Sequence, residues 1–217
     1  MKPRRPLLER LYHRYLETED TAGFVRAVGE RYLTCTLARL AAGGSHVSRR
    51  AAVLAITFLG DFSHNAVLGR ALKDRDRGVR LLADQGIRQL WRRDGSPQQR
   101  QKLTRLCRLN QNDQYDAALA AANELIAEAP WLAEAWNQRA IAHFARRRFC
   151  EAADDCHQTL ELNAYHFGAA VGLAHAYLHL DEPLAALESF RRALALHPDL
   201  EDVRGQIARL ERTLEGK

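Results

Sequence analysis

The sequence has few cysteines and no long hydrophobic run, and each shortage excludes a class of protein. Its four cysteines include no Cys-x-x-Cys pair, so they indicate neither a zinc site nor a disulfide framework. Free thiols are typical of a reducing compartment, and we expect a cytoplasmic protein. The longest apolar stretch, Ala51 to Leu59, is interrupted by Thr57 and is too short to span a bilayer. No apolar run follows the basic residues 1–6, so the sequence predicts no membrane segment and no secretory signal.

Motifs of nucleotide binding and catalysis are also missing. The sequence has no Gly-rich phosphate loop, no His-Glu-x-x-His and no Gly-x-Ser-x-Gly. His175 and His179 are four residues apart and would share one helix face, as two metal ligands do, but the sequence offers no third ligand. We therefore predict no cofactor, no metal and no enzymatic activity.

Composition indicates helix and an uneven distribution of charge. Alanine, leucine and arginine dominate while valine, isoleucine and threonine are few, which favours α-helix throughout. Residues 1–98 hold 18 Lys and Arg against 10 Asp and Glu, whereas residues 99–217 hold 14 against 17. The net charge of +5 therefore belongs to the N-terminal part. The length of 217 residues fits one large or two small domains.

Two 34-residue units, residues 133–166 and 167–200, align position by position. Position 8 is Ala140 and Ala174, and position 20 is Ala152 and Ala186. Small residues at these positions let the two helices of a hairpin approach closely, while large apolar residues fill the space between them. With a proline at position 32 of the second unit, this pattern resembles the tetratricopeptide (TPR) repeat.

The TPR resemblance implies helical hairpins from residue 99 onward. A degenerate first repeat fits residues 99–132, with Tyr115 at position 17 and Ala118 at position 20. Residues 201–215 carry one apolar stripe on a charged helix, the kind of terminal helix that closes a solenoid. The glycine and proline of residues 95–98 predict a linker before the first repeat.

A different repeat pattern occupies residues 20–93. In its better copy, Asp74 lies in a turn between two helical stretches and Arg80 is near the start of the second. This resembles the HEAT repeat, in which such Asp and Arg residues link successive repeats by charge pairing. The resemblance implies a structural role for both residues. Ahead of the repeats, Thr21 is expected to cap a helix that runs to the glycines at 43 and 44.

Together these patterns predict an all-α solenoid of helical hairpins. We interpret the chain as a protein–protein interaction scaffold that binds a peptide or helix of a partner protein in the concave TPR groove. The expected divisions are a HEAT-like region at 1–94, a linker at 95–98, and a TPR domain at 99–217 with repeats at 99–132, 133–166 and 167–200 and a capping helix at 201–215.

The TPR resemblance also implies which side chains line the groove, because that family uses positions 2, 5, 9, 12 and 13 of the first helices. In this sequence the corresponding positions hold apolar, amide and imidazole side chains. Such a surface can bury the apolar residues of a peptide while it forms hydrogen bonds with the peptide backbone. These positions include Leu103, Cys107, Asn110, Glu134, Asn137, Ile141, Phe144, Val171, His175, Leu178 and His179. One TPR subclass clamps C-terminal carboxylates with cations, which are missing here at Leu103, Cys107, Gln138, Gly168 and Gly172.

Arginines define a second candidate surface. Their clustering in the first 94 residues leaves open an alternative function, in which the basic HEAT-like region binds a nucleic-acid backbone. An arginine run in the middle TPR repeat offers a docking point for an acidic partner. The basic surface comprises Arg49, Arg50, Arg70, Arg77, Arg146, Arg147 and Arg148. A second alternative is an enzyme, because the short HEAT form resembles repeats of bilin lyases.

Overall fold

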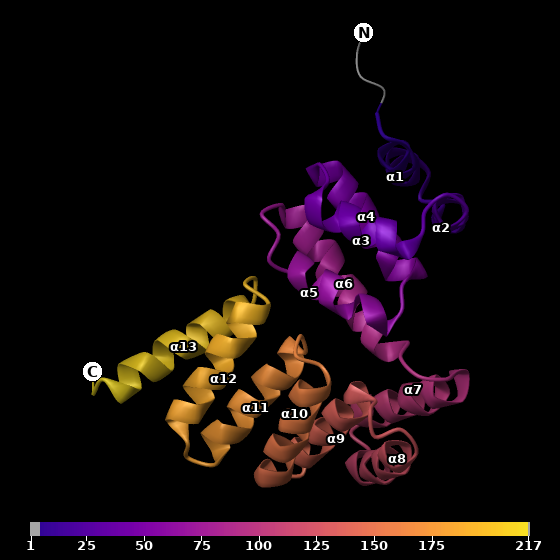
Figure 1. Cartoon of the computed structure of the whole chain (residues 1–217). Helices are drawn as coiled ribbons and strands as arrows, with labels where there is room; N and C mark the ends of the chain where they lie inside the picture. Colours follow the sequence, from indigo (N-terminus) through magenta and orange to yellow (C-terminus); the bar gives the residue numbers. More distant parts are fainter. Residues whose placement is uncertain (1–4, 217) are drawn as a thin grey trace. The chain divides into compact units, whose positions relative to one another are not determined.

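Two groups of helices make up the part of the chain that the structure describes (Figure 1). The computed structural model describes residues 5–216, so the basic residues 1–4 and Lys217 lie outside it. Thirteen α-helices and one short 3-10 helix form the regular structure of these residues, with no strand. The all-helical solenoid expected from the sequence is confirmed. Packing divides the chain into an N-terminal unit, which ends at Arg93, and a C-terminal unit, which begins at Asp94.

The N-terminal unit consists of three helical hairpins. Its helices are α1 (Leu7–Thr18), α2 (Thr21–Gly29), α3 (Thr34–Gly43), α4 (His46–Leu59), α5 (Asn65–Ala71) and α6 (Arg77–Arg92), with a 3-10 turn, η1, at Phe62–His64. Each odd-numbered helix packs on the even-numbered helix that follows it. Helix α4 also contacts α1, α2 and α6, so it is the central element of this unit.

The second and third hairpins repeat in register. Helices α3 and α5 begin at residues 34 and 65, and α4 and α6 begin at residues 46 and 77, an offset of 31 in both cases. The caps repeat as well. Ser45 accepts a hydrogen bond from the backbone N–H of Ser48 at 3.1 Å, and Asp76 accepts one from the N–H of Val79 at 3.0 Å. Residues 31 apart therefore hold equivalent places in the two hairpins.

Burial of α4 fixes the core of this unit. Residues 51–57 are all buried, so α4 is covered on every side. Close packing against α6 depends on Gly86, where an added Cβ would lie only 2.1 Å from the hydroxyl oxygen of Thr57. Near the end of α6, the buried Trp91 donates its indole N–H to the side-chain oxygen of Asn65 at 2.7 Å. This hydrogen bond ties α6 to the start of α5.

One helix predicted from the sequence is two helices in the structure. The pattern from Thr21 predicts a single helix as far as residue 43, but the chain leaves the helical conformation between Gly29 and Thr34. Leu33, which precedes α3, is extended with φ −72° and ψ 148°. Helix α2 ends at Gly29, and glycine is a weak helix former. The break lets α2 pack on α1 and α3 on α4.

The C-terminal unit contains three further hairpins and a final helix. Its helices are α7 (Pro97–Gln111), α8 (Tyr115–Glu128), α9 (Ala133–Ala145), α10 (Phe149–Leu162), α11 (Phe167–His179), α12 (Pro183–Leu196) and α13 (Glu201–Leu214). Each helix packs on the next along the chain, as Figure 1 shows most clearly for α9 to α13. Equivalent helices of the second and third hairpins begin 34 residues apart, at 133 and 167 and at 149 and 183.

Small buried residues allow these hairpins to close. Ala140, Ala152, Ala174 and Ala186 are between 0% and 4% exposed. At these positions a larger side chain would separate the two helices of a hairpin. The final helix α13 buries Val203 and Leu210 against this unit.

The start of the C-terminal unit differs from the prediction of a linker at 95–98. Helix α7 already begins at Pro97. Ser96 caps it by accepting a hydrogen bond from the N–H of Gln99 at 3.2 Å, and the side chain of Gln99 accepts one from the N–H of Ser96 at 2.8 Å. Proline is favourable in this first helical position because it has no N–H to satisfy. Local capping therefore extends the helix into the expected linker.

The turn inside each C-terminal hairpin contains a left-handed residue at the same repeat position. Asp113, Arg147 and Asp181 have φ of 58°, 59° and 59°. Residues other than glycine, asparagine and aspartate rarely adopt this backbone conformation. The middle turn thus holds an arginine where its two equivalents hold aspartate.

Candidate functional site

Residues predicted to line the groove lie on α7, α9 and α11, the first helices of the three C-terminal hairpins. Helix α9 packs against both α7 and α11. Ile141 on α9 is 44% exposed. The members that are exposed or half-buried are Cys107, Asn137, Ile141, Phe144, Val171, His175, Leu178 and His179.

Three predicted groove residues are buried, and their assignment to an open surface is corrected. Leu103 is 1% exposed because it packs in the core between α7 and α8. Asn110 is 9% exposed and Glu134 is 6% exposed, and both are engaged in hydrogen bonds between neighbouring helices. These three side chains connect helices within the unit.

A buried hydrogen-bond chain links the first helices of the three hairpins. The Asn110 amide on α7 donates to the side-chain oxygen of Gln138 on α9 at 2.9 Å and to its backbone carbonyl at 2.8 Å. The Gln138 amide donates to Glu134 at 2.7 Å. The other oxygen of Glu134 lies 3.0 Å from Nε2 of His166, which caps α11. His166 Nδ1 accepts the backbone N–H of Ala169, so Nε2 carries a proton and donates to Glu134.

Glu134 remains ionised inside this chain. Burial by itself would raise its pKa, but the hydrogen bonds from His166, Gln138 and Asn137 outweigh burial and lower the pKa. A buried carboxylate needs such partners because removing one from water costs several kcal/mol.

Gln138 and His166 were not selected from the sequence as partners of Glu134. A signal was present for His166. Its repeat position is occupied by Leu132 and Leu200 at the ends of the other two repeats. A polar residue at an otherwise apolar repeat position indicates a buried polar partner.

Three rings gather where α9, α10 and α11 meet. His179 stacks on Phe149 with ring centroids 4.2 Å apart and an angle of 5° between the planes. Phe144 meets both rings edge-on at 5.3 Å. Phe149 was not among the predicted groove residues. This ring cluster extends the apolar surface of Ile141, which lies one turn before Phe144 on α9.

The two histidines considered as metal ligands pack separately. His175 lies edge-on to Phe190 at 5.2 Å, while His179 belongs to the ring cluster. Burial, and then the neighbouring His179, lower the pKa of His175, which favours its neutral form. No group of three or more His, Cys, Asp or Glu side chains in residues 5–216 is arranged to hold a metal ion.

The arginine run of the middle hairpin lies between α9 and α10. Arg146 is 3.2 Å from a carboxylate oxygen of Asp116 on α8. Arg147 occupies the left-handed position and Arg148 is the cap residue of α10, and all three are exposed. The run therefore precedes Phe149 of the ring cluster, and among residues 5–216 an ion pair is formed by Arg146 of its three arginines.

Arg49 and Arg50 are removed from the predicted basic surface. Arg49 is 4% exposed and forms a bidentate pair with Asp74, with N–O distances of 2.7 and 2.8 Å. Arg50 pairs in the same way with Asp76, at 2.7 and 2.8 Å. The arginine pairs connect α4 to the turn between α5 and α6. Asp74 therefore does link two repeats, but its carboxylate pairs with Arg49 and its backbone carbonyl accepts from Arg80.

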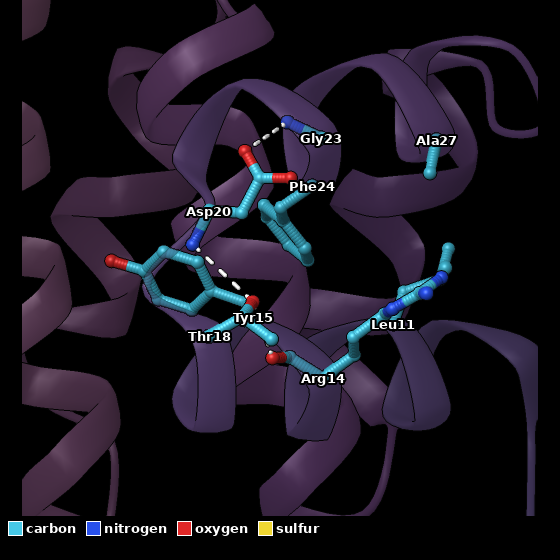
Figure 2. A pocket seen from close by; sticks show the side chains of 8 residues that line it. All are labelled: Leu11, Arg14, Tyr15, Thr18, Asp20, Gly23, Phe24 and Ala27. Atoms are coloured by element: carbon cyan, nitrogen blue, oxygen red, sulfur yellow. Dashed lines mark hydrogen bonds between the residues drawn. The ribbon is translucent and has the colours of Figure 1, made fainter.

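A small hollow lies between α1 and α2 (Figure 2). Leu11, Tyr15, Phe24 and Ala27 supply its apolar lining. The carboxylate of Asp20 at its edge is already bonded to the N–H of Gly23, which caps α2. Its volume of about 80 Å³ accommodates part of one side chain and is far below the size of a cofactor site.

Comparison with known proteins identifies one type of repeat. No family model matches the chain. A TPR repeat-containing protein from Rhizobium etli is 30% identical over 100 residues, which are 46% of this chain and 49% of that protein. Sperm-associated antigen 1 from Rattus norvegicus is 31% identical over 83 residues, 38% of this chain and 9% of that protein. The chain thus spans about half of the first relative and a small part of the second.

Solved structures agree. The first TPR domain of Spaghetti (RPAP3), bound to an HSP90 peptide, superposes with a TM-score of 0.54 at 20% identity over 56% of this chain and 96% of its own. The Sgt2 TPR domain from Aspergillus fumigatus gives 0.52 at 16% identity over 55% and 81%. The chain contains a TPR fold. The same comparisons give no support for a HEAT assignment. Within residues 5–216, no helix is long and apolar enough to cross a membrane.

Proposed function

We propose that this protein is a non-enzymatic scaffold whose TPR repeats bind a peptide or helix of a partner protein on the surface of α9 and α11. The observation that carries this proposal is Ile141, an aliphatic side chain 44% exposed beside the ring cluster of Phe144, Phe149 and His179. Exposed apolar side chains beside polar ones are typical of sites where proteins bind each other.

The spacing of the strip suits a helical or extended ligand. Ile141 and Phe144 are one turn apart on α9, and Val171, His175 and Leu178 follow one another at similar spacing on α11. An amphipathic helix presents its apolar side chains at intervals of three and four residues, which matches such a row. The half-buried Asn137 amide and the His175 imidazole supply polar contacts beside the apolar ones.

A C-terminal carboxylate is not the expected anchor. Spaghetti's first TPR domain was solved with an HSP90 peptide, but the positions that supply cations in the carboxylate-binding TPR subclass are uncharged here. Among them, Leu103 and Gln138 are also buried, and Gly168 and Gly172 have no side chain to offer. We therefore expect the partner to be held through apolar side chains.

The finer organisation of the chain is part of the proposal. We assign residues 1–94 to a HEAT-like region and residues 99–217 to a TPR domain. Support for the first assignment comes from the 31-residue register of the second and third hairpins and from the pairs that Arg49 and Arg50 form across it. The TPR groove is then the proposed site for the partner.

Two matched variants test the groove. Ile141→Glu places a carboxylate on α9, and Leu184→Glu does the same at a residue of α12 that is 67% exposed. Both sites are open, so both variants should fold, which circular dichroism checks. Tagged proteins are used to capture partners from a lysate of the source cells in 0.5 M salt.

A protein that binds the parent and Leu184→Glu but is at least tenfold depleted with Ile141→Glu would support the groove. A partner that binds all three equally, or is lost equally from both variants, would contradict it. High salt removes purely ionic contacts, so the comparison isolates the apolar surface.

A further inference from the structure

The turn between α5 and α6 is more basic than its sequence indicates. Residues 73–77 read Lys-Asp-Arg-Asp-Arg, which has a net charge of only +1. In the structure, however, both carboxylates face α4, where Asp74 binds Arg49 and Asp76 binds Arg50. Their side chains are only 13% and 18% exposed. The cations of this turn are left on the surface without their neighbouring acids.

These cations have no competing partner in the part of the chain that the structure describes. Lys73, Arg75 and Arg77 are exposed, and so is Arg70 at the end of α5. No side chain among these four forms a hydrogen bond or ion pair with another described residue. Glu9, a carboxylate near this end of α4, is occupied by the hydroxyls of Ser45 and Ser48, and these hydrogen bonds lower its pKa.

The repeat register extends the group to a second hairpin. Arg39 on α3 and Arg70 on α5 are 31 residues apart, so they hold equivalent places on two helices that pack together. The axes of packed helices lie about 8–10 Å apart, so the two arginines stand on adjacent helices of the same unit. Arg39 is also exposed, and no ion pair or hydrogen bond holds its side chain among residues 5–216. We call the five residues Arg39, Arg70, Lys73, Arg75 and Arg77 the basic stripe.

We propose that the basic stripe binds the phosphate backbone of a nucleic acid without reading its bases. A DNA duplex carries one negative charge per about 1.7 Å of helix axis, so a group of exposed cations on one unit can neutralise several phosphates at once. None of the five side chains is aromatic, whereas recognition of unpaired bases depends on stacking on aromatic rings. The contact is therefore ionic and independent of base sequence.

Two other polyanionic partners fit the stripe less well. A protein interface has an apolar centre, but Ala71 and Leu72 within this segment are buried and leave none. A membrane-surface element combines cations with an exposed apolar face, whereas on α6 the stripe adjoins a single exposed large apolar side chain, Leu81, one turn after Arg77. Protein surfaces that bind nucleic acids are more polar and more positively charged than those that bind proteins. This site is separate from the groove of the proposed function and stands without it.

The test is the affinity of the full chain for a labelled 20-base-pair DNA duplex of mixed sequence, measured by fluorescence anisotropy. If all five cations engage phosphates, the affinity falls about 500-fold between 50 and 200 mM KCl. The variant with all five residues changed to glutamine should bind at least 100-fold more weakly at 50 mM KCl. Changing the four arginines to lysine should preserve the affinity within about threefold, because both side chains bind phosphate.

A matched control removes five charges elsewhere. Its substitutions are Arg146→Gln, Arg147→Gln, Arg148→Gln, Arg191→Gln and Arg192→Gln. The proposal predicts little loss for this control, and an equal loss would overturn it by showing that only net charge matters. A preference above tenfold for one DNA sequence would also overturn it, as would stripe-dependent binding of polyglutamate or phosphatidylserine vesicles in place of DNA. Similar affinity for an RNA duplex of the same sequence would support backbone recognition.

Discussion

The two units join their hairpins by different chemistry. In the N-terminal unit, Arg49 and Arg50 form bidentate ion pairs with Asp74 and Asp76 in the turn of the next hairpin. In the C-terminal unit, the connection is a buried chain of amides that ends at one carboxylate and one imidazole. Of the two ion pairs, Arg50–Asp76 is partly exposed to solvent. The chain of amides is buried between helices, where each unmade hydrogen bond costs more.

This difference determines what each unit presents to its surroundings. The N-terminal ion pairs hold Asp74 and Asp76 against α4, and the cations of the same turn stay exposed on the surface. The C-terminal chain keeps its one charge inside and leaves an apolar strip with half-buried polar groups. Similar hairpin stacks thus support a basic surface in one unit and an apolar surface in the other.

The largest expected effect comes from breaking the small-residue packing of the C-terminal unit alone. Ala140→Glu places a carboxylate where Ala140 is 4% exposed between two helices. An unpaired buried charge should destabilise this unit by roughly 4 kcal/mol or more. Urea unfolding followed by circular dichroism checks this. The control is Ala145→Glu at an exposed residue of the same helix, which should change stability by less than about 0.5 kcal/mol. Equal unfolding of Ala140→Glu and the parent would show that the repeat register is wrong.

An intermediate effect is expected from interrupting the buried chain. His166→Leu restores the residue type found at the equivalent positions of the other repeats but leaves Glu134 without its imidazole partner. The loss of one hydrogen bond to a buried carboxylate should cost roughly 1–3 kcal/mol.

Glu134→Gln sharpens this test. Glutamine keeps the shape and an acceptor oxygen but removes the charge, so the double variant should be more stable than His166→Leu alone. A double-mutant cycle from denaturant unfolding measures the coupling. Additive losses would show that Glu134 and His166 do not interact.

The smallest effect is expected for the Arg50–Asp76 ion pair, because its arginine is partly solvated. The hydrogen bonds from Arg50 lower the pKa of Asp76 from 3.8 to about 2. The folded pKa is below the unfolded one, so the pair contributes stability above about pH 4, and the contribution is lost as the pH falls toward 2. Arg50 is 36% exposed, and the energetic contribution should stay below about 1 kcal/mol.

Carboxyl NMR titration measures this directly. Asp76 should titrate near pH 2 in the parent and at a clearly higher pH in Arg50→Gln, where the hydrogen bond from the N–H of Val79 still lowers its pKa. A parent Asp76 that titrates near 3.8 would contradict the ion pair. Glu134, whose pKa is also lowered, should be insensitive to Arg50→Gln because it belongs to the other unit.

The helical hairpins of the C-terminal unit could be predicted from the sequence. Helix packing there requires small residues at fixed positions, so the 34-residue spacing of Ala140, Ala174, Ala152 and Ala186 locates α9 to α12. The division of residues 21–43 into two helices was missed. It lets α3 pack on α4, and the spacing of apolar residues along the sequence does not indicate such a contact.

Surface assignments were less predictable because they depend on partners distant in sequence. Arg49 looks like a surface cation until the turn containing Asp74, 25 residues later, folds back on it. Asn110 and Glu134 hold groove positions of the repeat but are covered by neighbouring helices. Lys73 was missed for the opposite reason, since the adjacent Asp74 offsets its charge in the sequence. The groove and the HEAT-like assignment stay predictions.

The hydrogen bond between Trp91 and Asn65 has an experimental consequence. Trp91 is the one tryptophan of the N-terminal unit, and it is 4% exposed, while Trp131 and Trp136 belong to the C-terminal unit. Trp131 is 55% exposed, so Phe is readily tolerated there, and Trp136 is half-buried. A protein with Trp131→Phe and Trp136→Phe therefore emits fluorescence from a single buried indole. The emission maximum of this variant reports the unfolding of the N-terminal unit. Circular dichroism reports the unfolding of both units, so the two signals together distinguish them.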